Sequence, residues 1–322
     1  MDRRDHREQN RVAWNAVVGA HESHRGDLSR FIGEGGNTLF QEERNLLGEL
    51  EGRSLVHFQC NSGGDSISLA KLGATVTGVD ISDEAVSRAR DLTKKTGTRA
   101  TFERADVYDW LEEATREGRR YDIAFASYGV ICWLPDLRGW ARGIAGILNP
   151  GGRFVLVDFH PAADIFDKDW NHVHEYPSGG EPLLLEEGVG DYVAVSGGGL
   201  TPAGFVEGVR DFQSPEGCYL FRWGLGEVIT ALAQAGLRIT ALEEYPYANG
   251  ERKFARMREL RGKRMVPPED VPTIPLMYGI LAEKDQQPAT RPKQTRVPET
   301  SLRREEEREG GDNVDAAEHR AF

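Results

Sequence analysis

Three features are scarce in this sequence: cysteine, long apolar runs and positive charge. Its 322 residues include only 3 cysteines, and Cys60, Cys132 and Cys218 form no C-x-x-C pair. Cysteines this far apart argue against a disulfide framework or a cysteine zinc site, and they are typical of a reducing cytoplasm. No apolar run approaches the roughly 18 residues that a membrane span requires, so no transmembrane segment is expected.

The shortage of positive charge bears on the choice of partner. Lysine and arginine together number 40, against 52 aspartates and glutamates, and the formal net charge is −12. We therefore expect no nucleic acid partner, because a polyanion would be repelled by most of the surface. Residues 1–6 are charged and lack the apolar stretch of a secretory signal. We expect a cytoplasmic protein without a membrane partner, and the sequence carries no signal for an oligomeric state.

Strand and helix patterns alternate from residue 54 onward. Helical periodicity separates most of the apolar or β-branched runs, and turns rich in Gly, Asn and Pro bound them. Seven runs predict strands: 54–60, 74–80, 100–105, 121–127, 153–159, 237–245 and 275–283. The alternation predicts an α/β fold with a doubly wound, seven-stranded and mostly parallel sheet that carries helices on both faces.

Composition divides the chain into five parts. Residues 1–50 are predicted to form an N-terminal helical cap, and 51–160 the cofactor-binding core. Residues 161–224 hold Pro, Gly and aromatic residues without clean periodicity, which is typical of an acceptor-binding insert or lid. Residues 225–285 are predicted to complete the core. Residues 286–322 are charged and nearly free of apolar residues, which predicts a disordered tail.

The first two predicted strands end in residues that suit a nucleoside. In an open parallel sheet, ligands bind beyond the carboxyl ends of the strands, where the strand order reverses. The first strand runs into Asn61-Ser62-Gly63-Gly64, and the second ends at Asp80. A carboxylate at that position can accept hydrogen bonds from both ribose hydroxyls. The pattern therefore predicts a cofactor that contains adenosine.

The loop after the first strand distinguishes between such cofactors. A dinucleotide site requires G-x-G-x-x-G, whereas this chain has Asn61 at the first glycine position, Gly63 at the second and Ser66 at the third. Asp65 is expected to cap the following helix, where its charge would oppose a phosphate. S-adenosylmethionine (SAM), which has no phosphate, fits better. A nicotinamide-dependent oxidoreductase stays open as the alternative.

Residues 53–159 resemble the class I SAM-dependent methyltransferases, and the resemblance extends more loosely to residue 284. It implies a Rossmann-like methyltransferase fold, SAM as the methyl donor, S-adenosylhomocysteine (SAH) as the product, and no metal. Five segments carry the resemblance. They are the first glycine-rich loop (55–63), the ribose strand (76–82), the segment with the third-strand acid (104–107), the fourth strand (121–127) and the L-x-P-G-G turn before the fifth strand (148–154).

The first loop departs from the D-x-G-C-G-x-G of that family. His57, Gln59 and Asn61 stand at the acid and the first two glycines, and H-x-Q-C is similar to a branch of bacterial small-molecule methyltransferases. The usual carboxylate for the methionine amino group is thus missing at residue 57, so the amides of Gln59 and Asn61 are expected to contact the methionine portion. This altered loop also leaves open a module that binds SAM without turnover.

The resemblance implies a set of cofactor-binding residues. Asp106 corresponds to the acid that faces the adenine amino group. Trp14 stands where an N-terminal helix folds over the cofactor, although core packing is an equal alternative. The complete set is Trp14, Gln59, Asn61, Gly63, Asp80, Ile81, Asp106, Val107, Ser127 and Tyr128.

The acceptor side has fewer signals. No N/D-P-P-Y/F motif follows the fourth strand, which argues against methylation of a nucleobase amine. Tyr128 and Trp133 are expected to wall the cavity around the sulfonium through cation–π contact, although Trp133 also suits a core position. The expected acceptor is a small organic molecule, such as a secondary metabolite, with O-, N- and C-methylation all open.

Histidine supplies the candidates for a catalytic base. His160 directly follows the fifth predicted strand, so we predict His160 and Tyr128 as catalytic residues, with a structural histidine as the alternative. His172 and His174 form an H-x-H pair without further ligands nearby, so no metal is expected there. His21 and His24 are expected at the surface, with a place at the mouth of the cavity as the alternative.

Overall fold

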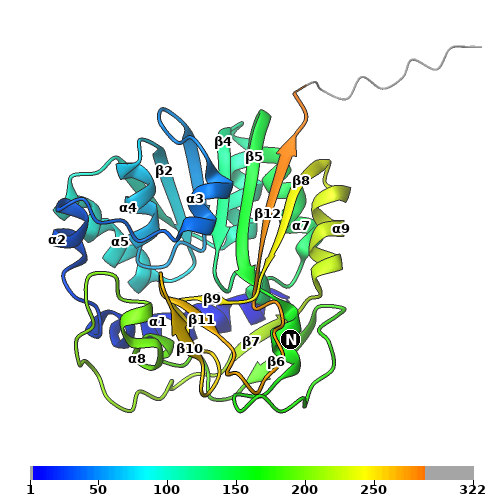
Figure 1. The fold of residues 1–322 in the computed structure, drawn as a ribbon. Coiled ribbons are helices and arrows are strands. Elements are labelled where there is room, and N and C mark those ends of the chain that lie inside the picture. The colour runs from blue at the N-terminus through cyan, green and yellow to red at the C-terminus, as the bar shows by residue number, and fades with distance from the viewer. Residues whose placement is uncertain (1–2, 287–322) are drawn as a thin grey trace, which may run out of the picture. The chain divides into compact units, whose positions relative to one another are not determined.

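The structure, a computed structural model, describes residues 3–286. At its centre is a seven-stranded sheet in the order β3-β2-β1-β4-β5-β12-β8 (Figure 1). Only β12 runs against its two neighbours, while the other pairs in the sheet are parallel. The predicted doubly wound, mostly parallel sheet is therefore confirmed. The strands are β1 (Ser54–Phe58), β2 (Thr75–Asp80), β3 (Ala100–Arg104), β4 (Tyr121–Ser127), β5 (Leu148–Phe159), β8 (Leu237–Tyr245) and β12 (Met277–Lys284).

Both faces of this sheet are buried under helices. Along β1, Leu55 belongs to the apolar cluster that includes α3, α4 and α5, whereas Val56 and Phe58 belong to the cluster that includes α6, α7 and α9. The alternation follows from the two-residue period of a strand. The covering helices are α3 (Gln41–Leu47), α4 (Gly64–Lys71), α5 (Asp83–Thr96), α6 (Val107–Arg116), α7 (Leu137–Ile147) and α9 (Leu225–Gln234).

Helix α6 was not among the elements predicted from the sequence. Asp106 is its N-cap and accepts a hydrogen bond from the Tyr108 backbone nitrogen at 2.8 Å. Trp110, Leu111 and Ala114 bury its inner face. A capping aspartate followed by apolar residues at this spacing is the signal that would have revealed the helix.

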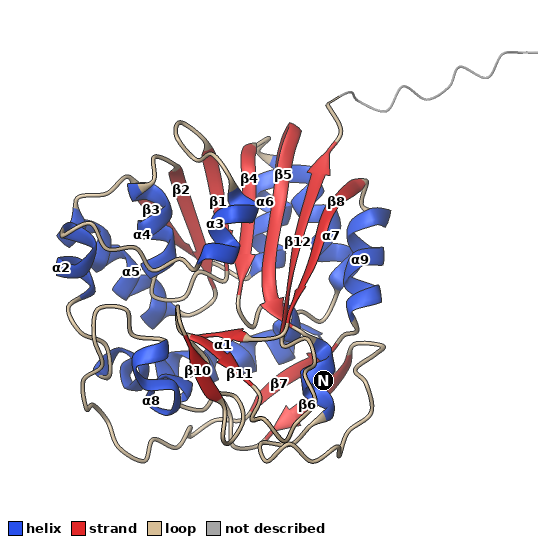
Figure 2. Cartoon of the chain, in the orientation of Figure 1, coloured by secondary structure: helices blue, strands red, loops and turns tan. Residues whose placement is uncertain are grey.

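Two smaller sheets lie beyond the end of the large sheet at which β4 and β5 terminate (Figure 2). The insert contains an antiparallel pair of strands, β6 (Glu181–Leu185) and β7 (Cys218–Arg222), which the irregular sequence of 161–224 did not predict. Residues 225–285 do not all return to the core, because part of this segment forms the other sheet. Its strands are β9 (Ala248–Asn249), β10 (Arg258–Leu260) and β11 (Arg264–Val266).

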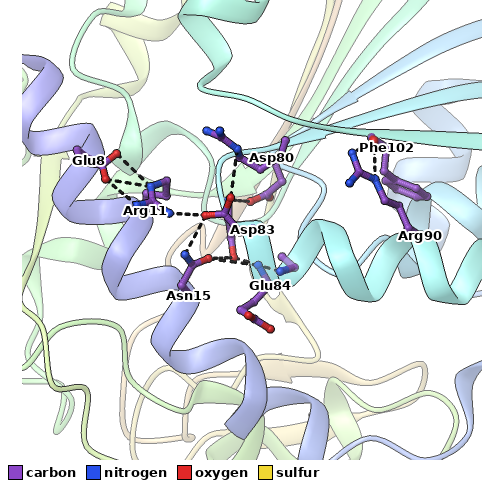
Figure 3. Close-up of polar contacts among 11 residues, drawn as sticks. Glu8, Arg11, Asn15, Asp80, Asp83, Glu84, Arg90 and Phe102 are labelled. Carbon is purple, nitrogen blue, oxygen red and sulfur yellow. Dashed lines mark hydrogen bonds and ion pairs between the residues drawn. The ribbon is translucent and has the colours of Figure 1, made fainter.

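The N-terminal segment, predicted as a helical cap, supplies three helices. The longest, α1 (Arg3–Ser23), is tied to the start of α5 beside the end of β2 (Figure 3). Asn15 Oδ1 accepts a hydrogen bond from Ser82 Oγ at 2.7 Å, and Asn15 Nδ2 donates one to Asp83 at 3.1 Å. Helix α1 therefore lies next to the predicted ribose site. The others are α2 (Leu28–Gly33) and α3.

No helix within residues 3–286 is both long enough and apolar enough to cross a membrane. The predicted tail, 286–322, lies outside the described residues except for its first position.

Candidate cofactor and acceptor site

A cavity of about 830 Å³ lies where β1, β2 and β4 end. Its size matches that of pockets that hold cofactors and other small organic ligands. The structure brings all ten predicted cofactor-binding residues together on its wall, while their contact with SAM stays a prediction. These residues are Trp14, Gln59, Asn61, Gly63, Asp80, Ile81, Asp106, Val107, Ser127 and Tyr128.

The loop after β1 is held in a left-handed backbone conformation. Gln59 and Asn61 have φ values of 51° and 48°, although neither is glycine. Gly63 has φ 78°, and a Cβ there would lie 2.7 Å from the Ala89 Cβ and 2.8 Å from the Phe102 ring. The glycine is therefore required by close packing as well as by its backbone angle.

Asp80 connects this loop to the end of β2. Its Oδ2 accepts a hydrogen bond from the Asn61 backbone nitrogen at 2.8 Å, and its Oδ1 accepts one from the Ser82 nitrogen at 2.8 Å. Burial raises the pKa of the Asp80 carboxyl above its usual value, which these hydrogen bonds partly oppose. Each carboxylate oxygen retains a lone pair beyond these bonds, which is what two ribose hydroxyls would need.

Asp106 makes two structural contacts at the predicted adenine end of the cavity. Besides capping α6, it forms an ion pair with Arg7 of α1. Burial raises its pKa, and Arg7 opposes that shift. Helix α1 is thus fastened on both sides of the predicted adenosine site, at Asp106 and at Asp83.

His57 does not replace the carboxylate that the first loop lacks. It is buried, and its Nδ1 lies 2.8 Å from Ser66 Oγ. Burial lowers the pKa of His57 to about 3, so the ring is neutral near pH 7. Any carboxylate at the predicted methionine end of the cavity therefore comes from another residue.

Gln59 and Asp65 supply the acceptors at that end. Among the described residues, nothing donates a hydrogen bond to the buried Gln59 Oε1, while its Nε2 donates to the Val130 carbonyl at 3.1 Å. Asp65 lines the cavity and accepts a hydrogen bond from Thr38 Oγ1 at 2.5 Å. The prediction that Asp65 caps its helix is wrong, because Gly63 is the N-cap and Asp65 lies within the first turn.

Tyr128 follows β4 with a φ of 53° and closes the cavity beyond Ser127. Its hydroxyl accepts a hydrogen bond from Asn249 Nδ2 at 3.0 Å. Burial raises the pKa of the Tyr128 phenol well above its usual value, and the charge of Glu43 adds to the shift. The group therefore stays protonated near neutral pH, which suits a wall or a hydrogen-bond donor and not a base.

His160 is not among the residues that line the cavity, which corrects its expected place there. Its Nδ1 accepts a hydrogen bond from the Ala162 backbone nitrogen at 3.0 Å and so caps the short helix 161–165. Its Nε2 lies 2.9 Å from Glu244. The bond at Nδ1 serves structure, and the alternative of a structural histidine fits this placement.

Aromatic rings form much of the remaining wall. Trp14 of α1 and Trp133 of the short helix Ile131–Trp133 meet edge to face, with ring centroids 5.3 Å apart, and both line the cavity. Each tryptophan therefore packs against the other ring and also lines the cavity. Core packing and a place on the cavity wall, which the sequence left as alternatives, occur together.

His21 and His24 are buried, so the expectation of a surface position is wrong. His21 Nε2 lies 3.2 Å from the Gly190 carbonyl, and His24 Nε2 lies 3.0 Å from Asp191 Oδ2. Asp191 is the N-cap of α8 (Tyr192–Ser196) in the insert. The two histidines therefore fasten the insert onto α1.

Sequence patterns missed the residues that the second small sheet brings to the cavity. Glu251 and Lys253 line it from the segment after β9. No sequence signal marked these two residues, since 225–285 had been assigned to the core.

Within 3–286, no group of three or more His, Cys, Asp or Glu is placed to hold a metal ion, and this includes His172 and His174.

Comparison with known families identifies the class of domain that this fold carries. Residues 56–154 match the family model of the methyltransferase domain. The prediction of a class I SAM-dependent methyltransferase is confirmed at the level of this domain. Membership of the H-x-Q-C branch stays a prediction.

Particular relatives share this part of the chain. A ubiquinone biosynthesis O-methyltransferase of Bordetella avium is 29% identical over 125 residues, which cover 38% of this chain and 50% of that protein. An uncharacterized methyltransferase of Synechocystis is 31% identical over 110 residues, with coverages of 34% and 48%. The chain thus spans about half the length of the curated relatives it matches.

One similar solved structure is an S-adenosylmethionine-dependent methyltransferase from Clostridium acetobutylicum. The two share 11% sequence identity with a TM-score of 0.49, and the match covers 77% of this chain and 92% of the other.

Proposed function

We propose that this protein transfers a methyl group from SAM to a small organic acceptor and leaves SAH as the product. The observation that carries the proposal is the carboxylate of Asp80, which faces the cavity from the end of β2, next to the point where the strand order reverses. A ribose is the ligand that an acid at this position recognises. The methyltransferase domain matched by residues 56–154 supports the same assignment.

The rest of the cofactor follows from the neighbouring groups. The adenine is assigned to Asp106 and Val107, and the methionine ammonium to the free Gln59 Oε1 and the carboxylate of Asp65. Asp65 then takes the place of the acid that is missing at residue 57. The same carboxylate would repel a pyrophosphate at the start of α4, which disfavours a nicotinamide dinucleotide.

Methyl transfer requires alignment more than it requires chemical activation by the protein. The sulfonium of SAM already activates the methyl group, and the acceptor attacks it in line, opposite the sulfur. The protein holds donor and acceptor in that line and keeps water out. The aromatic rings of Trp14, Trp133 and Tyr128 provide a low-polarity wall that suits a sulfonium cation and a planar acceptor.

The division of the chain is part of this proposal. We assign residues 1–50 to a cap over the cofactor, 51–160 to the core, and 161–224 to a lid that shapes the acceptor pocket. Residues 225–285 complete the core and add the small sheet of β9, β10 and β11. A cytoplasmic location is also proposed, and the three unpaired cysteines support it. The O-methyltransferases among the relatives support a small-molecule acceptor, and no nucleic acid partner is proposed, given the net charge of −12.

Titration of the protein with SAH in a calorimeter tests the cofactor assignment. Asp80→Ala is expected to weaken SAH binding by about 100-fold or more, because the two lost hydrogen bonds to a charged group contribute about 1.5–3 kcal/mol each. Asp91→Ala is the matched control, since Asp91 lies exposed on α5 and, among residues 3–286, pairs only with Lys94. Unchanged affinity in Asp80→Ala would refute the ribose assignment.

Product formation separates an enzyme from a module that only binds. Incubation with SAM and candidate acceptors is expected to release SAH. Tight binding of SAH without any such release, across a broad panel of acceptors, would favour the non-catalytic alternative. That alternative rests on the altered loop at His57, Gln59 and Asn61.

A further inference from the structure

A carboxylate that the proposed cofactor contacts do not use lies on the wall of the cavity. Glu251 follows β9 and lines the cavity together with Tyr128 and Lys253. Within the described part of the chain, no group donates a hydrogen bond to the Glu251 carboxylate. An acid that is held inside a cavity without a partner is available to a ligand.

The backbone on both sides of Glu251 is fixed. Before it, Asn249 donates a hydrogen bond from its side chain to the Tyr128 hydroxyl at 3.0 Å. After it, the Arg252 backbone nitrogen donates to Ser196 Oγ at 3.1 Å. The carboxylate is therefore carried on a rigid support, as a group that acts on a bound acceptor needs to be.

Three charged groups surround this carboxylate. Lys253 follows it by two residues and donates a hydrogen bond to Asp164 at 2.5 Å. The negative charges of Asp158, near the end of β5, and of Asp164 also act on it. Burial raises the pKa of Glu251 to about 7, with Lys253 opposing the shift and the two aspartates adding to it. A group with such a pKa can both take and release a proton at neutral pH.

We propose that Glu251 is the general base that removes the hydroxyl proton of a phenolic acceptor. This inference rests on the proposed function and specifies its acceptor. The acceptor O–H bond breaks and its proton passes to a Glu251 carboxylate oxygen. The acceptor oxygen forms a bond to the methyl carbon, the carbon–sulfur bond breaks, and its electron pair stays on the sulfur of SAH. The proton on Glu251 then leaves to solvent.

Two features around the site favour a phenol as the acceptor. Lys253 lines the cavity close to Glu251 in the chain, so its ammonium stabilises the oxyanion that forms as the hydroxyl loses its proton. A phenol, with a pKa near 10 as in tyrosine, lies within reach of a base near 7, and an aliphatic alcohol does not. A carboxylic acid would need no base. The aromatic walls at Trp14, Trp133 and Phe159 suit a planar ring.

Two phenols of different acidity test this role. Methylation of para-methoxyphenol, which is weakly acidic, and of para-nitrophenol, which ionises near neutrality, is measured with SAM for the wild type and for Glu251→Gln. We expect kcat for para-methoxyphenol to fall about 100-fold or more, the usual contribution of a general base. The loss for para-nitrophenol is expected to be much smaller, because that acceptor is already ionised.

A matched control separates the role of Glu251 from the loss of a charge. Glu259→Gln removes an acid of the same length from β10 of the same small sheet, where it pairs with Arg252 and Lys263. We expect the control to keep wild-type rates with both phenols. The rise of kcat with pH near 7 is expected in the wild type and absent from Glu251→Gln with para-methoxyphenol.

Each outcome decides between the two proposals. Wild-type rates in Glu251→Gln, or equal losses for both phenols, would overturn the role of Glu251 as a base. A wild type that binds SAH but methylates neither phenol would overturn the acceptor class alone. A wild type that does not bind SAH would overturn the proposed function, and this inference with it. Retained SAH binding by Glu251→Gln shows that the variant is folded.

Discussion

At the scale of single residues, the cavity contains several groups in conformations or charge states that cost stability. Gln59, Asn61 and Tyr128 have positive φ angles without being glycine. Glu251 is a partly buried acid whose pKa is raised to about 7. Strain and unpaired charge of this kind gather at functional sites, where the surrounding structure holds them in place. Their concentration along one cavity supports its assignment as the site of chemistry.

Gly63 allows a direct test of this strain. Gly63→Ala is expected to lower the free energy of unfolding by about 2 kcal/mol or more, since a Cβ would combine an unfavourable φ with contacts under 3 Å to Ala89 and Phe102. Gly97→Ala is the control, because Gly97 has φ 60° and nothing within 4 Å of its Cβ position. Urea unfolding measures both, and equal losses would show that packing contributes nothing.

At the scale of secondary-structure elements, the cavity is closed by segments that are far apart in the sequence. Helix α1 is fastened to the core at Asp83 and Asp106. The insert is fastened to α1 through His21 and His24. These polar contacts therefore hold the N-terminal helix, the insert and the core together around the cavity.

Burial of His21 against the insert is expected to lower the stability of the folded state in acid. Burial lowers the pKa of His21 to about 4, from 6.5 in a model compound. The folded state disfavours the protonated ring, so stability is complete above pH 6.5 and is lost as the pH falls toward 4. The loss should reach about 3 kcal/mol, at 1.36 kcal/mol per pKa unit.

Urea unfolding across this pH range measures the effect. His21→Gln, which cannot titrate, is expected to show a flatter dependence of stability on pH between about 4 and 6.5. His174→Gln is the control, because His174 is exposed. A slope in His21→Gln equal to that of the wild type would contradict the assignment.

At the scale of the whole molecule, one sheet and two small sheets enclose a single large site. The residues that line it extend along the chain from Arg7 in α1 to Lys263. A ligand that fills it therefore links distant segments and should stabilise them together.

This linkage predicts a shift in thermal unfolding. SAH at about 100 times its dissociation constant is expected to add about 2.7 kcal/mol to the free energy of unfolding. For a domain of this size, that raises the Tm by roughly 5–10 °C. NADH is expected to leave the Tm unchanged, since Asp65 opposes a pyrophosphate. A rise with NADH and none with SAH would instead favour the nicotinamide alternative.

The sequence predicted the sheet and the cofactor side of the site because both depend on local patterns. Asp80 was recognised since it ends a β-branched strand, and Gly63 since it lies in a glycine-rich turn. The acceptor side was missed for the opposite reason. Glu251 lies at the cavity because it follows β9, which belongs to a small sheet and not to the large one. His160 does not line the cavity, and its ring caps a short helix instead.

The sequence by itself therefore determined the strand alternation, the order of the turns and the position of the ribose acid, which short-range periodicity and spacing specify. Only the tertiary structure decided which side chains share the cavity. Contacts such as Asn249 with Tyr128 and His24 with Asp191 join residues more than 100 positions apart. The burial that raises the pKa of Glu251 is likewise a product of packing between distant segments, and no local pattern carries it.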